Sequence, residues 1–195
     1  HLLLVQVLRH WSELATLLPI SLRLHLPLCI SDRGERLPIR PATYADWPAI
    51  WGMLRPVFRA GETYAVDCDI TESAARALWL DAPAATYIAH DDSVLGTFFI
   101  KTNHHGGARH VCNCGYVTAA DAQGRGVARA MCEHSQSEAR PLGYAALQLN
   151  LVLASNAGAI RLWQKLGFDI VGTLPAAFDH PSLGLVDAHI MCKVL

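Results

Sequence analysis

The chain has neither an excess of basic residues nor a long apolar run. Sixteen Lys and Arg stand against 17 Asp and Glu, which gives a formal net charge of −1 at pH 7 with histidine neutral. Proteins that bind nucleic acid usually carry a basic patch that neutralises phosphates, so we expect no nucleic-acid partner. Charges and prolines also interrupt the apolar stretches. None approaches the roughly 20 residues of a membrane-spanning helix, so no membrane span is expected.

The six cysteines include no Cys-x-x-Cys pair. Without that spacing, and without His-x-x-x-His, the histidines and cysteines between His104 and Cys114 fit no zinc pattern, so we predict no metal. The chain is long enough to bury a sizeable core and does not need a disulfide framework. We therefore expect free thiols and a reducing, cytoplasmic compartment.

The first 36 residues differ from the rest of the chain. They are rich in leucine, but charges and prolines break the pattern that a signal peptide requires. Leu4, Leu8, Trp11 and Leu18 follow helical spacing, which favours an amphipathic helix over residues 2–18. We interpret residues 1–36 as an N-terminal extension packed on the domain, or as one added by an early start site. Residues 37–195 are then a single domain.

From residue 37 onward, strand and helix signals alternate. We predict strands at 37–40, 86–90, 94–102, 111–118, 145–153, 168–174 and 185–194, and helices at about 43–60, 70–80, 127–140 and 156–166. Asp91-Asp92-Ser93 is a hairpin signal, and Pro56 is expected to end or kink the first helix. The pattern predicts an α+β fold around a mostly antiparallel sheet, with one strand–helix–strand unit.

A glycine-rich turn, Gln-Gly-Arg-Gly-Val-Ala at residues 123–128, lies between a predicted strand and a predicted helix. Such a turn points unpaired backbone N–H groups and the positive end of the helix dipole at one spot, which suits phosphate. Gly124 and Gly126 let the backbone come close, and Arg125 adds a positive charge. The third glycine of a dinucleotide fingerprint and the Gly-Lys-Ser/Thr of a P-loop are both missing. Alone, the glycine pair also fits a plain turn.

A second segment, residues 150–168, reads as strand, Ser/Asn cap, short helix, glycine stop and a new strand. Together the two segments resemble the Gcn5-related N-acetyltransferase (GNAT) superfamily. The cofactor motif of that superfamily, Gln/Arg-x-x-Gly-x-Gly/Ala, is met by Gln123–Ala128. Its second motif is met by Asn156, Ala159, Lys165, Gly167 and Phe168. Trp163 stands where a tyrosine is usual. The resemblance covers roughly residues 37–195.

Four shorter segments resemble one subgroup of the superfamily. They are residues 61–64, 95–101, 112–116 and 150–152, in that order. The subgroup includes N-acetyltransferases that detoxify proline analogues such as L-azetidine-2-carboxylate, together with bacterial relatives that have no assigned substrate. The resemblance therefore implies the reaction more firmly than it implies the substrate.

The resemblance implies a GNAT fold, a mostly antiparallel mixed sheet whose central strands splay apart between flanking helices. It implies acetyl-CoA as co-substrate, lying between the strand that ends at Thr118 and the strand that holds Asn150. Its pantetheine arm would pair with free backbone groups near Thr118 and Ala119. The implied cofactor-binding residues are Thr118, Ala119, Gln123, Gly124, Arg125, Gly126, Val127, Ala128 and Asn156. Asn156 is equally well placed to be an ordinary helix cap.

Asn113 and Asn150 are polar residues inside otherwise apolar strands, where a buried amide must find partners. Each could satisfy a neighbouring backbone group. The resemblance implies instead that both bind the acceptor, a small amino or imino acid, and both are the predicted catalytic-site residues. Trp163 cannot act as the general acid that a tyrosine would supply, and it could equally be a core residue. No base is assigned, although Glu62 and Tyr64 are expected to border the acceptor pocket.

The motifs leave three alternatives open. The chain could be a CoA-binding module without catalysis, or it could acetylate another small amine or a protein terminus. A homodimer also stays open. The leading interpretation is an N-acetyltransferase that moves the acetyl group directly to the amine in a ternary complex, with a small-molecule amine as its partner.

Overall fold

The computed structural model describes residues 37–195. The N-terminal extension at 1–36, with its predicted helix, lies outside the described residues. Between residues 37 and 195, no helix combines the length and the apolar character that crossing a membrane would require. The five cysteines in this part of the chain are all free thiols, as the sequence predicts.

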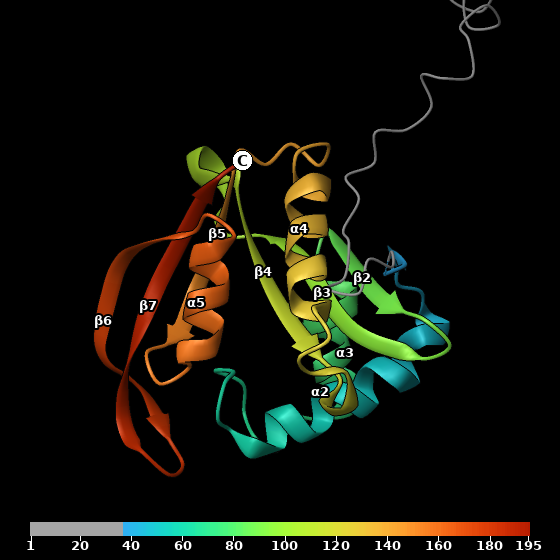
Figure 1. Cartoon of the computed structure of the whole chain (residues 1–195), viewed down its shortest axis with the longest axis horizontal. Coiled ribbons are helices and arrows are strands. Elements are labelled where there is room, and N and C mark those ends of the chain that lie inside the picture. The colour runs from blue at the N-terminus through green and yellow to red at the C-terminus, as the bar shows by residue number, and fades with distance from the viewer. Residues whose placement is uncertain (1–36) are drawn as a thin grey trace, which may run out of the picture.

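The described residues form a single sheet of seven strands (Figure 1). The strands are β1 Ile39–Pro41, β2 Ala85–His90, β3 Val94–Thr102, β4 Val111–Thr118, β5 Ala146–Leu153, β6 Asp169–His180 and β7 Gly184–Val194. Their order is β1-β2-β3-β4-β5-β7-β6, and all neighbours are antiparallel except β4 and β5. The predicted α+β class is confirmed.

Helices cover both faces of this sheet. They are α2 Trp47–Ala60, α3 Glu72–Arg76 with a π turn at Ala77–Asp81, α4 Val127–Ala139 and α5 Ala157–Lys165. Because side chains alternate along a strand, neighbouring residues of β3 serve opposite cores. Phe98 packs in the core under α4 and α5, and Phe99 packs in the core under α2 and α3. Figure 1 shows α4 and α5 together in front of the sheet.

The first helix does not end at Pro56, which was one of the two outcomes expected there. It runs through Pro56 to Ala60, and Gly61 ends it with a left-handed φ of 64°. Pro56 and Gly52 are both exposed, so water can reach the Gly52 carbonyl that loses its helical partner. The buried face of the helix, which includes Leu54 and Phe58, keeps it packed on both sides of the proline.

The sixth strand is longer than the predicted 168–174. β6 continues past Pro175 to His180 and pairs with β7 on one side only. A proline within a central strand would remove a ladder hydrogen bond, but β6 is an edge strand and tolerates it.

Candidate active site

The parallel pairing between β4 and β5 stops early. It consists of Val111↔Ala146, Cys112↔Leu147 and Asn113↔Gln148, after which the two strands diverge (Figure 1). Immediately beyond the last pair, the register of β5 against β7 shifts between Leu149 and Val152. A bulge bends the strand that carries it, so this irregularity accounts for the splay of β5 from β4 that the family resemblance implied.

Beyond their last pair, β4 and β5 leave a gap between them. The alternation of the β3–β4 ladder determines which backbone groups of β4 face this gap. Two hydrogen bonds bracket this ladder, from Asn103 N to Val111 O at 3.0 Å and from Ala119 N to Leu95 O at 2.8 Å. In an antiparallel pair, every second residue points its N–H and C=O away from the partner strand. Cys114, Tyr116 and Thr118 therefore turn these groups toward β5, where the two strands have separated.

The prediction that Ala119 offers free backbone groups is wrong. Its N–H donates to Leu95, and its carbonyl accepts from Ala122 N at 3.0 Å. Ala119 closes the β3–β4 ladder and begins a short 3-10 turn, Ala120–Ala122, so both of its groups are used. Thr118, one residue earlier, keeps the predicted orientation toward the gap.

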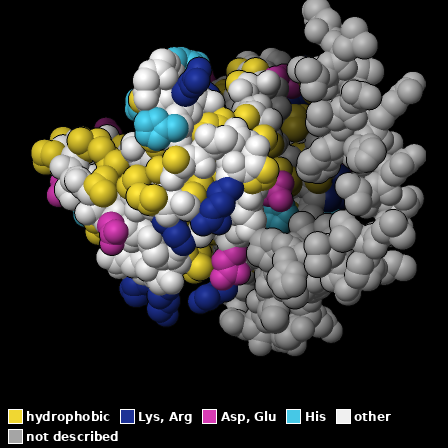
Figure 2. Space-filling model, turned by 90° about the horizontal axis from the view of Figure 1, so that it is seen from above, with side chains coloured by type: hydrophobic (Ala, Val, Ile, Leu, Met, Phe, Trp, Pro, Cys, Tyr) yellow, Lys and Arg dark blue, Asp and Glu magenta, His cyan; other side chains and the backbone are white. Residues whose placement is uncertain are grey.

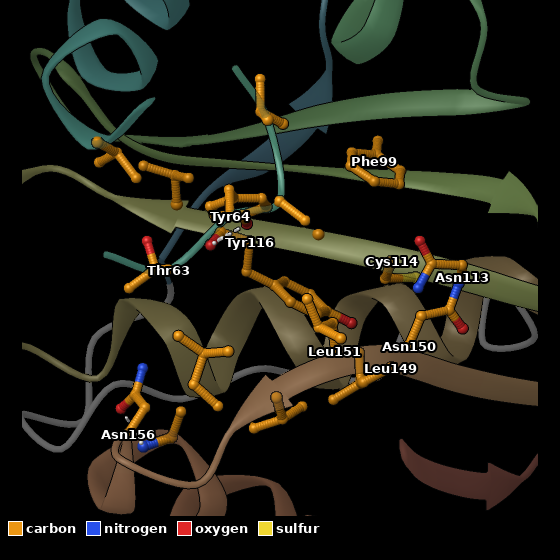
Figure 3. A pocket seen from close by; sticks show the side chains of 18 of the residues that line it. Thr63, Tyr64, Phe99, Asn113, Cys114, Tyr116, Leu149, Asn150, Leu151 and Asn156 are labelled. Atoms are coloured by element: carbon orange, nitrogen blue, oxygen red, sulfur yellow. Dashed lines mark hydrogen bonds between the residues drawn. The ribbon is translucent and has the colours of Figure 1, made fainter. Parts of the chain in front are cut away.

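The gap opens into a cavity of about 540 Å³. Its walls come from β4, β5, the start of α5 and the segment that follows α2, represented by Thr63 and Tyr64 (Figure 3). Asn113 and Asn150 lie next to each other at one end of the view, whereas Asn156 lies at the other. The structure thus brings both predicted acceptor residues to one cavity and places the predicted pantetheine contact across it.

The glycine-rich turn lines a second hollow of about 300 Å³. Helix α4 starts directly after it, and its first hydrogen bond runs from Ala130 N to Gly126 O at 3.0 Å, which leaves the preceding N–H groups without a helical partner. Gly124 and Gly126 have left-handed φ angles of 74° and 80°. A Cβ added at Gly124 would meet no atom within 4 Å, so the space in front of the turn is open.

The two hollows share two residues, Thr118 and Gln123. The two hollows therefore connect the edge of β4 with the glycine turn at the start of α4, which suits a long ligand with a peptide-like arm and a phosphate end. Residues 123–128 fit the predicted anion site in backbone geometry. The side chain of Arg125 is paired with Asp91 of the β2–β3 turn at 3.1 Å, so its charge is partly compensated.

Asn156 fulfils its predicted role as a helix cap. Its Oδ1 accepts from Ala159 N at 3.1 Å, which satisfies one free donor of α5. The same residue lines the main cavity, and its Nδ2 donates to no described residue. The cap and the predicted contact with a pantetheine arm are therefore compatible.

The two acceptor-site asparagines have different surroundings. Asn113 is half-buried, and its Nδ2 donates to the Gln148 carbonyl at 2.9 Å. Asn150 is exposed, not buried as the apolar strand suggested, because it lies in the bulge of β5. Its Nδ2 donates to Asn103 Oδ1 at 2.7 Å, and its Oδ1 accepts from Gln148 Nε2 at 2.9 Å.

Asn103 and Gln148 contact Asn150 without lining the cavity, and the sequence interpretation missed both of them. Gln148 and Asn150 are two apart on β5, so strand alternation could have placed them on one face. Asn103 lies just after β3, and nothing in its local sequence indicates a contact with a residue 47 positions away.

The walls of the cavity are otherwise uncharged. Among the described residues that line it there is no carboxylate, histidine, lysine or arginine, and Glu62 is not part of the lining. Its titratable side chains are Tyr64, Cys114 and Tyr116. Burial disfavours their anions and raises the pKa of each group above its ordinary value. The Tyr64 hydroxyl donates to the Tyr116 carbonyl at 2.9 Å.

Trp163 lines the cavity from α5 and is 8% exposed. Its ring centroid lies 5.1 Å from that of Tyr116 and 6.4 Å from that of Phe168. It is therefore both a packed core residue and a wall of the candidate site.

A splayed parallel strand pair, a glycine turn at a helix start beside it and neutral amides at one end of the cavity are the features expected of a transferase that takes a phosphate-bearing acyl donor. Comparisons with known proteins also indicate an acyltransferase. Residues 47–168 match the acetyltransferase (GNAT) family. N-acetyltransferase aca1 of Schizosaccharomyces pombe is 30% identical over 150 residues, which cover 67% of this chain and 71% of that protein.

Solved structures share the fold. A GCN5-related N-acetyltransferase from Kribbella flavida is 42% identical with a TM-score of 0.77, over 82% of this chain and 98% of that one. The putative acetyltransferase yncA from Salmonella typhimurium, solved with acetyl-CoA, is 21% identical with a TM-score of 0.70, over 83% and 95% of the two chains. The latter likeness concerns the fold alone.

The chain belongs to the acetyltransferase (GNAT) family. The predictions of the superfamily, of the GNAT fold and of an acetyl-CoA-dependent acetyltransferase are therefore confirmed. The alternative of a CoA-binding module without catalysis is set aside by this membership.

Replacement of Trp163 by Phe should leave kcat within about tenfold of the original value, a barrier change below about 1.4 kcal/mol. An indole cannot act as a general acid in this chemistry, so its loss should remove packing and not a proton donor. The loss of contact with Tyr116 and Phe168 should lower the free energy of unfolding by about 1–3 kcal/mol. Thermal melts and steady-state kinetics check both effects. A collapse of kcat with normal acetyl-CoA affinity would show that the indole takes part in catalysis.

Proposed function

We propose that this acetyltransferase moves the acetyl group of acetyl-CoA to the amine of a small amino or imino acid, directly and in a ternary complex. The observation that carries the proposal is the shape of one cavity. It has the open edge of β4 along one wall and the neutral amides of Asn113 and Asn150 at one end.

The donor would be held mainly by backbone groups. The free backbone groups at Cys114, Tyr116 and Thr118 would pair with the pantetheine arm, with Asn156 across the gap. The Tyr116 carbonyl is not among them, because it already accepts from the Tyr64 hydroxyl. The N–H groups of residues 123–128 would hold the pyrophosphate. When bound, acetyl-CoA supplies an acetyl thioester that a neutral amine can attack.

The acceptor would be held by the amides. A carboxylate accepts hydrogen bonds only, and the Nδ2 groups of Asn113 and Asn150 are donors that add no charge. Uncharged walls favour the neutral form of an amine over the ammonium form, because desolvation penalises the charged state. The cavity can therefore bind the carboxylate end and favour the neutral amine, whose ammonium proton is lost to water. The proton released when that amine attacks the thioester would pass, directly or through water, to the departing CoA thiolate, so no side-chain base is required.

This mechanism predicts the pH dependence. Below the pKa of the acceptor amine, kcat/KM should rise about tenfold per pH unit, since only the neutral amine reacts. Tyr64, Cys114 and Tyr116 have raised pKa values and stay protonated near neutrality, so they should add no inflection. Rate profiles for two acceptors with different amine pKa values provide the check. An inflection at the same pH for both would reveal a base on the enzyme.

Recognition of the carboxylate can be tested with a matched pair of acceptors. L-Azetidine-2-carboxylate and its carboxamide share the ring amine and differ in the group that the asparagines would bind. We expect the carboxylate to be preferred about tenfold or more in kcat/KM, the worth of a hydrogen bond to a charged group, when the two are compared at equal concentrations of the neutral amine. Equal values would refute an amino or imino acid as the acceptor. They would favour another small amine or a protein terminus.

The sequence prediction of a cytoplasmic protein stays a proposal, supported by the five free thiols between residues 37 and 195. A homodimer is also proposed, supported by exposed hydrophobic side chains on one side of the molecule. Hydrophobic side chains gather on the side of the molecule that carries β6 and β7 (Figure 2), and Ile170, Val171 and Leu174 of the edge strand are 39%, 62% and 41% exposed. Sedimentation equilibrium would show a single monomeric species if this proposal is wrong.

A further inference from the structure

Three amide side chains form a chain of hydrogen bonds behind the acceptor end of the cavity. Gln148 Nε2 donates to Asn150 Oδ1 at 2.9 Å, and Asn150 Nδ2 donates to Asn103 Oδ1 at 2.7 Å. Asn150 lines the cavity, whereas Asn103 and Gln148 do not. Asn150 is therefore held from two sides by residues that do not face the substrate space.

The two contacts fix which way the Asn150 amide points. An amide has a donor end and an acceptor end, and a turn of half a revolution about its last bond exchanges them. In the observed arrangement, the acceptor end of Asn150 meets a donor and the donor end meets an acceptor. With Asn103 and Gln148 in their observed orientations, the exchanged arrangement would set oxygen against oxygen at Asn103 and nitrogen against nitrogen at Gln148, so it is disfavoured.

Asn103 is itself held in place. Its backbone N–H donates to Val111 O at 3.0 Å, the first bond of the β3–β4 ladder, and the residue is half-buried. Its Nδ2 is buried and has no hydrogen-bond partner among the described residues. An unsatisfied buried donor lowers stability, so it calls for an explanation. The contact that the structure shows for the other end of this amide is the hydrogen bond that Asn103 Oδ1 accepts from Asn150.

We infer that Asn103, together with Gln148, is a positioning residue that fixes the Asn150 amide with its remaining Nδ2 hydrogen available to the acceptor carboxylate. The inference rests on the proposed function, because it concerns the same acceptor end. It adds a residue outside the cavity to the determinants of acceptor binding.

The test uses two substitutions that each add one negative charge with little change in shape. Asn103→Asp keeps an acceptor opposite Asn150 Nδ2 and removes the unsatisfied donor. Gln148→Glu replaces a donor with an acceptor opposite Asn150 Oδ1. If only charge mattered, the two variants would behave alike. The fixed orientation predicts that Gln148→Glu raises the acceptor KM about three- to tenfold more than Asn103→Asp. Both should keep the acetyl-CoA KM.

Asn103→Leu removes the contact without adding charge. It should raise the acceptor KM about three- to tenfold and shift the Asn150 side-chain amide signal in an NMR spectrum, with the acetyl-CoA KM unchanged. The acceptor for these assays is L-azetidine-2-carboxylate. Equal effects of Asn103→Asp and Gln148→Glu, or an unchanged Asn150 signal in Asn103→Leu, would overturn the inference. Normal acceptor kinetics in Asn150→Ala would instead refute the proposed acceptor site, whatever the NMR signal shows.

Discussion

Replacement of Gly126 by aspartate should weaken acetyl-CoA binding at least about a hundredfold. Gly126 precedes the first residue of α4 and has a φ of 80°, in the left-handed region that favours glycine. A carboxylate there would stand beside the N–H groups at the start of α4 and repel the pyrophosphate. The loss of two hydrogen bonds to a charged group costs about 3–6 kcal/mol, and each 1.4 kcal/mol is about tenfold in Kd.

Two further variants separate charge from backbone strain. Gly126→Asn has the same shape without the charge, and asparagine tolerates a positive φ, so its Kd should rise less than about tenfold. Gly143→Asp introduces the same residue at a φ of 89° beyond the far end of α4, where an added Cβ meets no atom within 4 Å. It should bind acetyl-CoA normally. Titration calorimetry gives all three affinities. An unchanged Kd for Gly126→Asp would mean that the phosphates bind elsewhere.

Asn150→Ala should lower kcat/KM for the acceptor about ten- to a hundredfold, the cost of a hydrogen bond to a charged group. The melting temperature should hardly change, because Asn150 is exposed and water can replace it as the hydrogen-bond partner of the Asn103 and Gln148 side chains. Acetyl-CoA affinity should also stay the same, since the donor binds along β4 and residues 123–128. Kinetics, thermal melts and cofactor titration on one preparation measure the three quantities.

Asn113→Ala provides the contrast. It removes the donor that serves the Gln148 carbonyl at the last β4–β5 pair, so it should lower the melting temperature as well as the acceptor kcat/KM. If Asn150→Ala lost stability but kept its acceptor kinetics, the amide cluster would be structural. The acceptor would then have to bind elsewhere in the cavity.

Local signals in the sequence were sufficient for most of the fold. Thr71 caps α3 with a hydrogen bond from Ala74 N at 3.2 Å, and Asp91-Asp92-Ser93 joins β2 and β3 as predicted. One predicted strand end was wrong for a non-local reason. β6 runs through Pro175, past the predicted end at residue 174, because it is an edge strand and tolerates a proline. The edge position cannot be deduced from the local sequence.

In the site, too, features that depend on neighbouring residues were predicted, and features that depend on distant segments were not. The glycine turn and the Asn156 cap depend on residues close in sequence, and the structure has both geometries as predicted. The availability of a backbone group depends on pairing with a distant strand. Ala119 is bonded to Leu95 for this reason, and the exposure of Asn150 follows from a bulge against β7. The Asn103–Asn150 contact has the same origin, because it joins two segments that only the assembled sheet brings together.

The most direct measurement is turnover of acetyl-CoA with L-azetidine-2-carboxylate, followed as release of the CoA thiol and as formation of the N-acetylated acid by mass spectrometry. The account predicts that the two rise together, with no acetylated protein accumulating, because the acetyl group passes directly to the amine. Thiol release without an acetylated acid, for this and other small amino and imino acids, would contradict it.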